Sequence, residues 1–235
     1  LQTKYKAALG ENLNLNLMGR FYNQYQDYTA PRGLIGATKI QEFNLHTKTD
    51  YSAKISQQHT LEWYATQYKA EEYLNTTQGE LYDKQAFTQT LIRPEWRSNF
   101  SEGVKGTLTL GLGATFETVD RTDYTATTDF KAPYSFVQWD GTLSGKINLI
   151  AGLRYDVHNV YRNQLSPKVA IYYPIDEKWS VKASMGSGYK APDFRQLYFN
   201  FSNSSAGYGV LGTEALGQEL PILQERGEIS NILIG

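Results

Sequence analysis

The chain of 235 residues contains no cysteine. This absence excludes a disulfide scaffold, a thiolate zinc site and a cysteine nucleophile. Acidic and basic residues nearly balance, at a formal charge of −1, so no net field attracts nucleic acid. The three histidines, His46, His59 and His158, stand far apart, and no G-x-S-x-G turn or Ser–His–Asp order is present. We therefore expect no metal, no cofactor and no catalytic residue.

Long hydrophobic runs are also missing. The longest apolar-looking stretch, Ile147 to Leu153, is interrupted by Asn148 and Gly152. It falls well short of the ~18 residues that a membrane-spanning helix needs. The first residues, LQTKYKAALG, lack the charged start and apolar middle of a signal peptide, which predicts that they come from the interior of a longer protein.

Aromatic residues, in contrast, are abundant. The chain has 18 Tyr, 10 Phe and 4 Trp, although its hydrophobic fraction is only 40% and its mean hydropathy is −0.50. A soluble globule of this size would concentrate Leu, Ile and Val in its core. The composition instead suits strands with one apolar and one polar face, with Tyr and Trp near a membrane–water boundary.

Alternation of apolar and polar residues is the clearest pattern. It runs through ENLNLNLMGRFYNQY, GTLTLGLGATFE, KINLIAGLRYDVH and KWSVKASMGSGY. A period of two places Leu108, Leu110 and Leu112 on one face of a strand, whereas a helix would scatter them. By the same parity His158 belongs to the polar face. The pattern predicts an all-β antiparallel meander of about ten strands. Their predicted spans are 1–8, 12–27, 39–54, 58–73, 84–99, 104–120, 133–143, 146–159, 165–175 and 178–189.

Predicted connections alternate between short and long. The short ones follow the first, third, fifth, seventh and ninth strands, and the longer ones fall at 28–38, 74–83, 121–132, 160–164 and 190–235. Outer-membrane barrels have tight periplasmic turns and long extracellular loops, so the strand beginning at Asn12 would run outwards. A soluble barrel or β-sandwich also gives alternating strands, but its strands usually have ~5–6 residues, and several here are predicted to be much longer.

One motif suggests a different class of protein. Residues 186–191, GSGYKA, match the dinucleotide-binding pattern G-x-G-x-x-A after a strand. That pattern requires a parallel βαβ unit, and nothing upstream alternates strand with helix. We interpret Gly186 and Gly188 as relaxing a strand near its end, and Pro192, which cannot donate to a ladder, as ending the pairing.

A family resemblance appears between Ala151 and Phe201. The segments AGLRYD, LSPK and GYKAP, followed by QLY, resemble the motifs of the TonB-dependent outer-membrane receptor barrel, in a version typical of Bacteroidetes-like bacteria. The family motif stands here as Gly188, Tyr189, Lys190, Ala191 and Pro192. The resemblance implies that residues 1–235 are part of a barrel of twenty-two strands in the outer membrane of a Gram-negative bacterium. It also implies that the plug domain and the last strands are absent from this chain.

The resemblance further implies a transporter rather than an enzyme. Its expected partners are outer-membrane lipid, the TonB complex acting through the plug, and a small ligand such as an iron chelate or cobalamin. Heme uptake is disfavoured, because no histidine follows His158 and no NPNL motif is present. The ligand-binding candidates are Tyr198, Asn200 and Tyr208, in the expected outer loop 190–235, whose end is expected to hold a short helix.

Two alternatives remain open at this point: a barrel hydrolase and a soluble β-sheet binding domain. We also expect that the isolated chain, with unpaired strand edges, either self-associates or bends into a compact open sheet.

Overall fold

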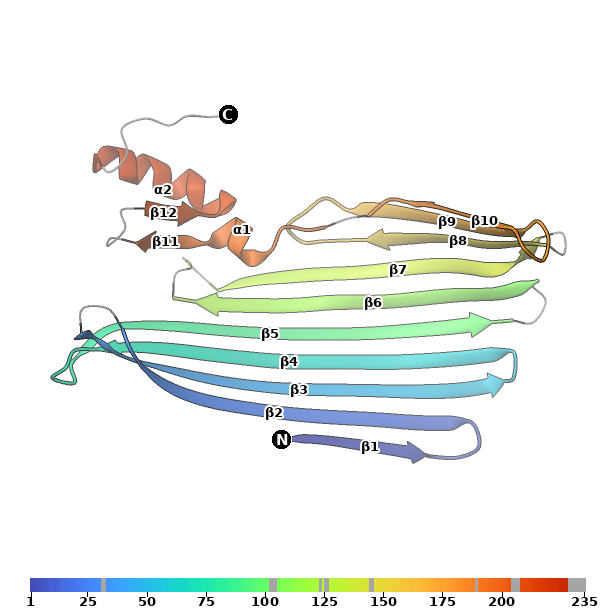
Figure 1. Cartoon of the computed structure of the whole chain (residues 1–235), viewed down its shortest axis with the longest axis horizontal. Coiled ribbons are helices and arrows are strands. Elements are labelled where there is room, and N and C mark those ends of the chain that lie inside the picture. The colour runs from blue at the N-terminus through green and yellow to red at the C-terminus, as the bar shows by residue number, and fades with distance from the viewer. Residues whose placement is uncertain are drawn as a thin grey trace.

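The computed structural model describes residues 1–30, 33–101, 105–122, 124, 127–143, 146–188, 190–203 and 208–227, without the side chains of 201–203, 208, 209 and 218. Ten antiparallel strands form one sheet in strict sequence order, as expected (Figure 1). The strands are β1 (Gln2–Ala8), β2 (Leu13–Thr29), β3 (Ile35–Lys54), β4 (Gln57–Asn75), β5 (Leu81–Phe100), β6 (Gly106–Arg121), β7 (Thr128–Leu143), β8 (Ile147–Asp156), β9 (Gln164–Pro174) and β10 (Ser180–Gly186).

All ten predicted strands are present, but the boundaries at one end of the sheet were wrong. β3 begins at Ile35 rather than 39, and β7 begins at Thr128 rather than 133. The expected long connections shrink to 30–34, 76–80 and 122–127. We call this the loop end of the sheet, and the opposite end the turn end. The error has a physical cause: near the loop end both faces of the strands are polar, so the hydropathy pattern fades while the backbone pairing continues.

The register places the predicted apolar residues on one face. Residues directly opposite each other in an antiparallel pair share a face. Leu108 lies opposite Trp139, Leu110 opposite Val137, and Leu112 opposite Ser135, which confirms that the three leucines point the same way. Tracing the register through all ten strands gives one continuous apolar face. Its apolar residues include Ala7, Leu13, Leu15, Leu17, Phe21, Phe43, Leu45, Leu61, Trp63, Ala65, Ile92, Pro94, Trp96, Phe100, Leu108, Leu110, Leu112, Ala114, Phe116, Val137, Trp139, Leu143, Ile147, Leu149, Ala151, Leu153, Leu165, Val169, Ile171, Val181, Ala183 and Met185.

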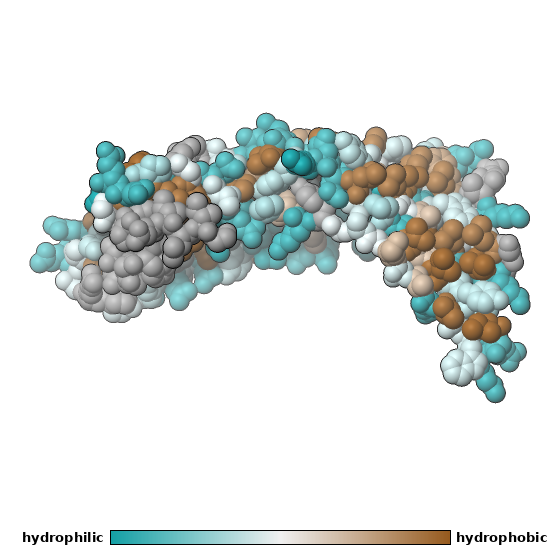
Figure 2. All heavy atoms as spheres, turned by 90° about the horizontal axis from the view of Figure 1, so that it is seen from above, coloured by the Kyte–Doolittle hydropathy of each residue, from teal (hydrophilic) through white to brown (hydrophobic). Residues whose placement is uncertain are grey.

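On the long strands β2 to β7 this apolar belt occupies only the half nearer the turn end, whereas on the shorter β8, β9 and β10 it runs along most of the strand. On β6 it extends from Leu108 to Phe116, which at ~3.3 Å per residue and a tilt near 45° corresponds to a height of about 20 Å. The lipid-facing band of an outer-membrane barrel is ~25 Å tall. In Figure 2 the hydrophobic residues gather mainly towards the right, where the turns of β1–β2 and β3–β4 lie in Figure 1. The polar half of the sheet therefore projects beyond the belt.

Little of this apolar surface is buried within the chain. Val119 and Ser98 are the largest fully buried side chains of the described residues, whereas Leu112 remains 55% exposed. Such a belt needs an apolar surrounding, which lipid supplies. Among the residues that the structure describes, no helix combines the length and the apolarity needed to cross a bilayer.

After β10 the chain folds into a small compact unit at the loop end. It consists of α1 (Phe194–Tyr198), β11 (Asn200–Asn203), β12 (Tyr208–Leu211) and α2 (Thr213–Glu225), with β11 and β12 paired as a hairpin. We call residues 193–225 the cap. The expected short helix is thus α2, and the described part of the expected outer loop 190–235 is largely regular structure. Figure 1 shows the cap beyond the loop end of β8, beside the loop-end parts of β6 and β7.

Candidate functional site

The cap is attached to the polar face of the sheet by an aromatic cluster. Phe194 stacks on Phe130 with ring centroids 3.8 Å apart and planes 10° apart, and both rings are buried together with Leu197 and Val119. Val119 and Phe130 have the parity of the polar face, so α1 lies over the inner side of the curved sheet. The local sequence starts α1 at this point, because Asp193 accepts from the amide of Gln196 and the Gln196 side chain accepts from the amide of Asp193.

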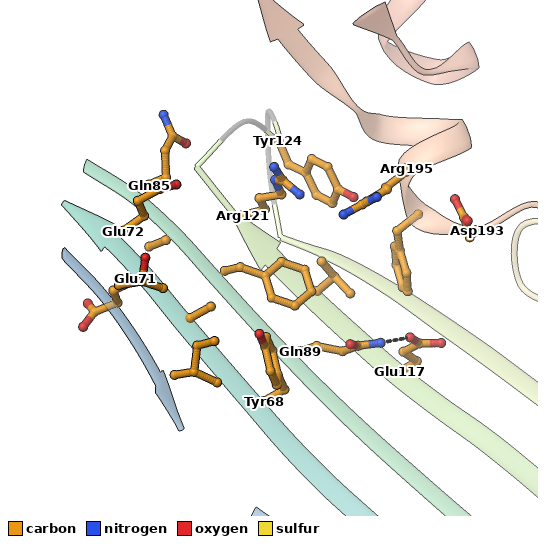
Figure 3. A pocket seen from close by; sticks show the side chains of 17 residues that line it. Tyr68, Glu71, Glu72, Gln85, Gln89, Glu117, Arg121, Tyr124, Asp193 and Arg195 are labelled. Carbon is orange, nitrogen blue, oxygen red and sulfur yellow. Dashed lines mark hydrogen bonds between the residues drawn. The ribbon is translucent and has the colours of Figure 1, made fainter. Parts of the chain in front are cut away.

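A cavity of about 530 Å³ lies between the sheet and α1. Its wall is formed by the loop-end halves of β3, β4, β5 and β6, and its roof by Tyr124 and the first residues of α1 (Figure 3). In Figure 3, Arg121, Tyr124 and Arg195 gather on one side, while Tyr68, Gln89 and Glu117 line the other. The lining residues are Thr38, Ile40, Tyr68, Ala70, Glu71, Glu72, Gln85, Ala86, Phe87, Gln89, Glu117, Val119, Arg121, Tyr124, Asp193, Phe194 and Arg195.

The inward-facing carboxylates of this cavity already have partners. Glu72 accepts a hydrogen bond from the hydroxyl of Tyr28, Glu117 accepts one from the amide of Gln89, and Asp193 caps α1. Arg121 lies over the ring of Phe199, 5.0 Å from its centroid. The cavity thus offers two guanidinium groups at the cap side and aromatic surface from Tyr68 and Phe87, whose rings meet edge to face at 5.7 Å.

The three sequence-predicted binding residues belong to the cap, and the two whose side chains the structure describes, Tyr198 and Asn200, do not line this cavity. Tyr198 packs into the aromatic cluster, 6.3 Å from Tyr124, and burial raises the pKa of its hydroxyl, with Glu214 and Asp129 adding to the rise. Asn200 is the first residue of β11, and Tyr208, whose side chain is outside the described part of the chain, is the first residue of β12. Their role in binding stays a prediction.

The predicted family motif at 188–192 occupies the connection between β10 and the cap. β10 ends at Gly186, earlier than the expected 189, and Tyr189 lies outside the described residues. The carbonyl of Pro192 accepts a hydrogen bond from Tyr161, at 3.1 Å. The residues that line the cavity, Asp193 to Arg195, follow directly. Sequence reasoning missed them because a single helical turn has no periodicity, although the Asp193–Gln196 spacing is a capping signal.

A second cavity, of about 560 Å³, lies on the polar face nearer the middle of the strands. Here polar side chains form connected pairs: His46 Nε2 lies 2.7 Å from Glu62, and the Tyr134 hydroxyl donates to Glu95 at 2.7 Å. Arg154 lies 3.8 Å above the Tyr134 ring and pairs with Asp156. The inner face is therefore charged and hydrogen-bonded at the level of the apolar belt.

A Ser–His contact bears on the hydrolase alternative. His59 Nδ1 lies 2.6 Å from Ser98 Oγ. However, Ser98 is 0% exposed, and the His59 ring is surrounded by Tyr51, Trp96 and Phe100 on the apolar face. A substrate could not reach this hydroxyl, so the hydrogen bond between His59 and Ser98 satisfies two polar groups among these aromatic rings. No group of three His, Cys, Asp or Glu that could hold a metal occurs within the described residues.

Comparison with known proteins agrees with this architecture. The chain is 25% identical over 155 residues to the iron-regulated outer membrane virulence protein of Vibrio cholerae, covering 66% of this chain and 23% of that protein. Its fold matches the siderophore receptor PirA of Pseudomonas aeruginosa, with a TM-score of 0.62, 14% identity, and coverage of 90% of this chain and 45% of PirA. The outer membrane transporter YddB of Escherichia coli matches with a TM-score of 0.62 and 10% identity over 74% of this chain and 29% of YddB.

This chain spans less than half the length of each of these proteins. The family model for the TonB dependent receptor-like β-barrel matches residues 1–220, nearly all of the sheet and cap. A ten-stranded meander with one lipid-facing belt and a charged inner face is what a segment of such a barrel requires. The chain belongs to the family of TonB-dependent outer-membrane receptors and forms part of their β-barrel.

Proposed function

We propose that the protein containing this barrel segment imports a small nutrient, and that the cavity beneath the cap contacts the ligand on its way in. The observation that carries this proposal is the position of the cavity. It lies on the inner face at the loop end, above the apolar belt, where a ligand arriving from outside would enter. With the tight turns on the periplasmic side, the loop end of the sheet faces the exterior of the cell.

The chemistry of the cavity favours an anionic ligand with aromatic surface, such as an iron chelate. Arg121 and Arg195 can donate to oxygen anions, and Tyr68, Phe87 and Phe194 offer ring faces. The related proteins support the same class, because one is iron-regulated and another is a siderophore receptor. Tyr198, Asn200 and Tyr208 remain candidates for contacts made by the cap itself.

The proposal includes the partners that import requires. Energy would come from a TonB complex that acts on a plug domain, and the charged inner face around His46, Glu62 and Glu95 would pack against that plug. Lipid would cover the apolar belt. No covalent chemistry is proposed, since the buried Ser98–His59 pair is inaccessible.

Growth assays on defined iron sources test this function. The full-length receptor is expressed in a strain that lacks its other iron-uptake receptors, and growth is measured with single iron chelates. We expect Arg121→Gln and Arg195→Gln each to weaken chelate binding at least about tenfold, and so to raise the chelate concentration needed for growth, because a charge-assisted hydrogen bond contributes roughly 1.5–3 kcal/mol. Arg226→Gln, at the end of α2, is the matched control and should bind as the wild type does. Unchanged binding in both cavity variants would overturn the assignment of the cavity.

A further inference from the structure

The apolar face carries a hollow just above the belt. Its volume is about 330 Å³. Most of its lining residues share the parity of the belt, namely Lys39, Gln41, Lys69, Glu71, Ala86 and Thr88, and Ala70 and Phe87 of the opposite parity complete it. The small residues Ala86 and Thr88 leave the space, and the longer lysines and glutamine border it. This surface is on the opposite side of the sheet from the cavity beneath the cap.

The height of the hollow coincides with the lipid headgroup layer. On β3 the last apolar residue of the belt is Phe43, and Gln41 and Lys39 are the next two residues on that face. On β4, Gln67 and Lys69 follow Ala65 in the same way. Two to four residues correspond to roughly 5–9 Å of height in a tilted strand, and the headgroup layer is about 5–8 Å deep on each side of the membrane.

The charge at the hollow is positive. Lys69 makes no ion pair or hydrogen bond within the described residues, and Lys39 lies opposite Glu71 in the register. Glu71 is already paired with Lys84, at 3.4 Å. Lys39, Lys69 and Lys84, which all have the parity of the belt, are thus balanced by the single carboxylate of Glu71. The other acids of this face, Asp27, Asp120 and Asp129, belong to β2, β6 and β7, outside the three strands that line the hollow.

Lysine side chains suit a position at the edge of the apolar belt. A lysine stem can lie along the apolar belt while its ammonium reaches the polar layer. Lys69 has no carboxylate partner among the described residues, and Lys39 shares Glu71 with Lys84, so an anionic headgroup would neutralise the remaining positive charge. Gln41 and Thr88 add neutral hydrogen-bonding groups beside the two ammonium groups.

We propose that this hollow binds the phosphate group of an outer-leaflet lipid, with Lys39 and Lys69 as the charged contacts and Gln41 and Thr88 as hydrogen-bonding neighbours. The proposal rests on the orientation given above, with the loop end outside. It does not depend on which nutrient is imported or on the cavity beneath the cap.

Lipid-binding measurements on the full-length receptor test the proposal. The receptor is placed in phosphatidylcholine nanodiscs that contain a small fraction of a diphosphorylated diglucosamine lipid or of its dephosphorylated form, and bound lipid is counted by native mass spectrometry. We expect the wild type to prefer the phosphorylated lipid. Each of Lys39→Gln and Lys69→Gln should reduce that preference about fivefold, and the double variant about 25-fold, because a basic residue near an anionic surface contributes about 1 kcal/mol.

The matched control removes the same charge from the other face. Lys48 on β3 and Lys182 on β10 belong to the polar face of the sheet. The double variant Lys48→Gln, Lys182→Gln should therefore keep the wild-type preference for the phosphorylated lipid. Equal binding of the two lipids by the wild type would overturn the proposal, as would equal losses in the two double variants. Displacement of the lipid by millimolar inorganic phosphate would assign the hollow to a free anion instead, which would also overturn it.

Discussion

The ring of Phe194 lies flat against the ring of Phe130, with centroids 3.8 Å apart. Phe194 begins α1, and Phe130 belongs to β7, so this stack is the closest of the ring contacts that join the cap to the barrel wall. Both rings are at most 7% exposed. The contact also forms one boundary of the cavity, because Phe194 is among its lining residues. The position of the cap and the shape of the cavity therefore depend on the same pair.

Removing the Phe194 ring should release the cap without unfolding the sheet. We expect Phe194→Ala to lower the free energy of cap opening by about 3 kcal/mol, the usual cost of deleting a buried phenyl group. Hydrogen exchange of peptides from residues 193–225 in the full-length receptor measures this. Leu216→Ala, which alters a side chain of α2 that is 40% exposed, is the control and should leave exchange unchanged. Equal exchange in wild type and Phe194→Ala would show that the stack does not hold the cap.

Two glycines of β6 leave room for aromatic rings on β7. Gly111 lies opposite Phe136 and Gly113 opposite Tyr134, and a methyl group at either glycine would overlap the facing ring. We expect Gly111→Ala to destabilise the barrel by about 1–3 kcal/mol, because the ring must leave its position.

The control for this substitution is Gly152→Ala on β8. Its new methyl group would meet Val137 O at 3.4 Å, an ordinary contact. Urea unfolding of the refolded full-length barrel compares the two variants. A smaller loss for Gly111→Ala than for Gly152→Ala would contradict the packing described here.

The apolar belt predicts a depth-dependent cost for charge. Leu112 is in the middle of the belt on β6, and Thr118 lies just above it on the same face. We expect Leu112→Arg to cost about 2–4 kcal/mol and Thr118→Arg about 0–1 kcal/mol in the free energy of unfolding from lipid vesicles. Similar costs at the two positions would mean that the belt does not contact lipid.

His158 links the stability of the loop end to pH. Burial lowers the pKa of His158 below its ordinary value of 6.5, and its ring lies 5.0 Å from Phe130. The Nδ1 atom accepts from the amides of Val160 and Tyr161, at 3.1 and 3.4 Å. The unfolded chain thus binds more protons than the folded chain below pH 6.5, so stability should fall as pH falls through that range.

Exchange rates of residues 157–163 at pH 7 and pH 5 measure this effect. His158→Asn keeps a side-chain acceptor but cannot titrate there, and it should remove the pH dependence. If residues 157–163 of the wild type had the same stability against exchange at pH 7 and pH 5, His158 would not be the source of the pH dependence.

The sequence by itself determined the strands, their order and their two faces. A period of two is enough to separate Leu108, Leu110 and Leu112 from their neighbours, because side chains alternate along any strand whatever it packs against. It also determined the family, through the motifs between Ala151 and Phe201. It misplaced the strand ends near the loop end, where both faces are polar and alternation carries no signal.

Only the tertiary structure decided which residues come together. The cavity combines side chains from β3 to β6 with residues 193–195, and no local pattern links segments so far apart in the chain. The Phe130–Phe194 stack and the hollow bordered by Lys39 and Lys69 likewise arise from register and packing between strands. Hydropathy periodicity reports which way one side chain points, whereas a site requires the distances between many of them.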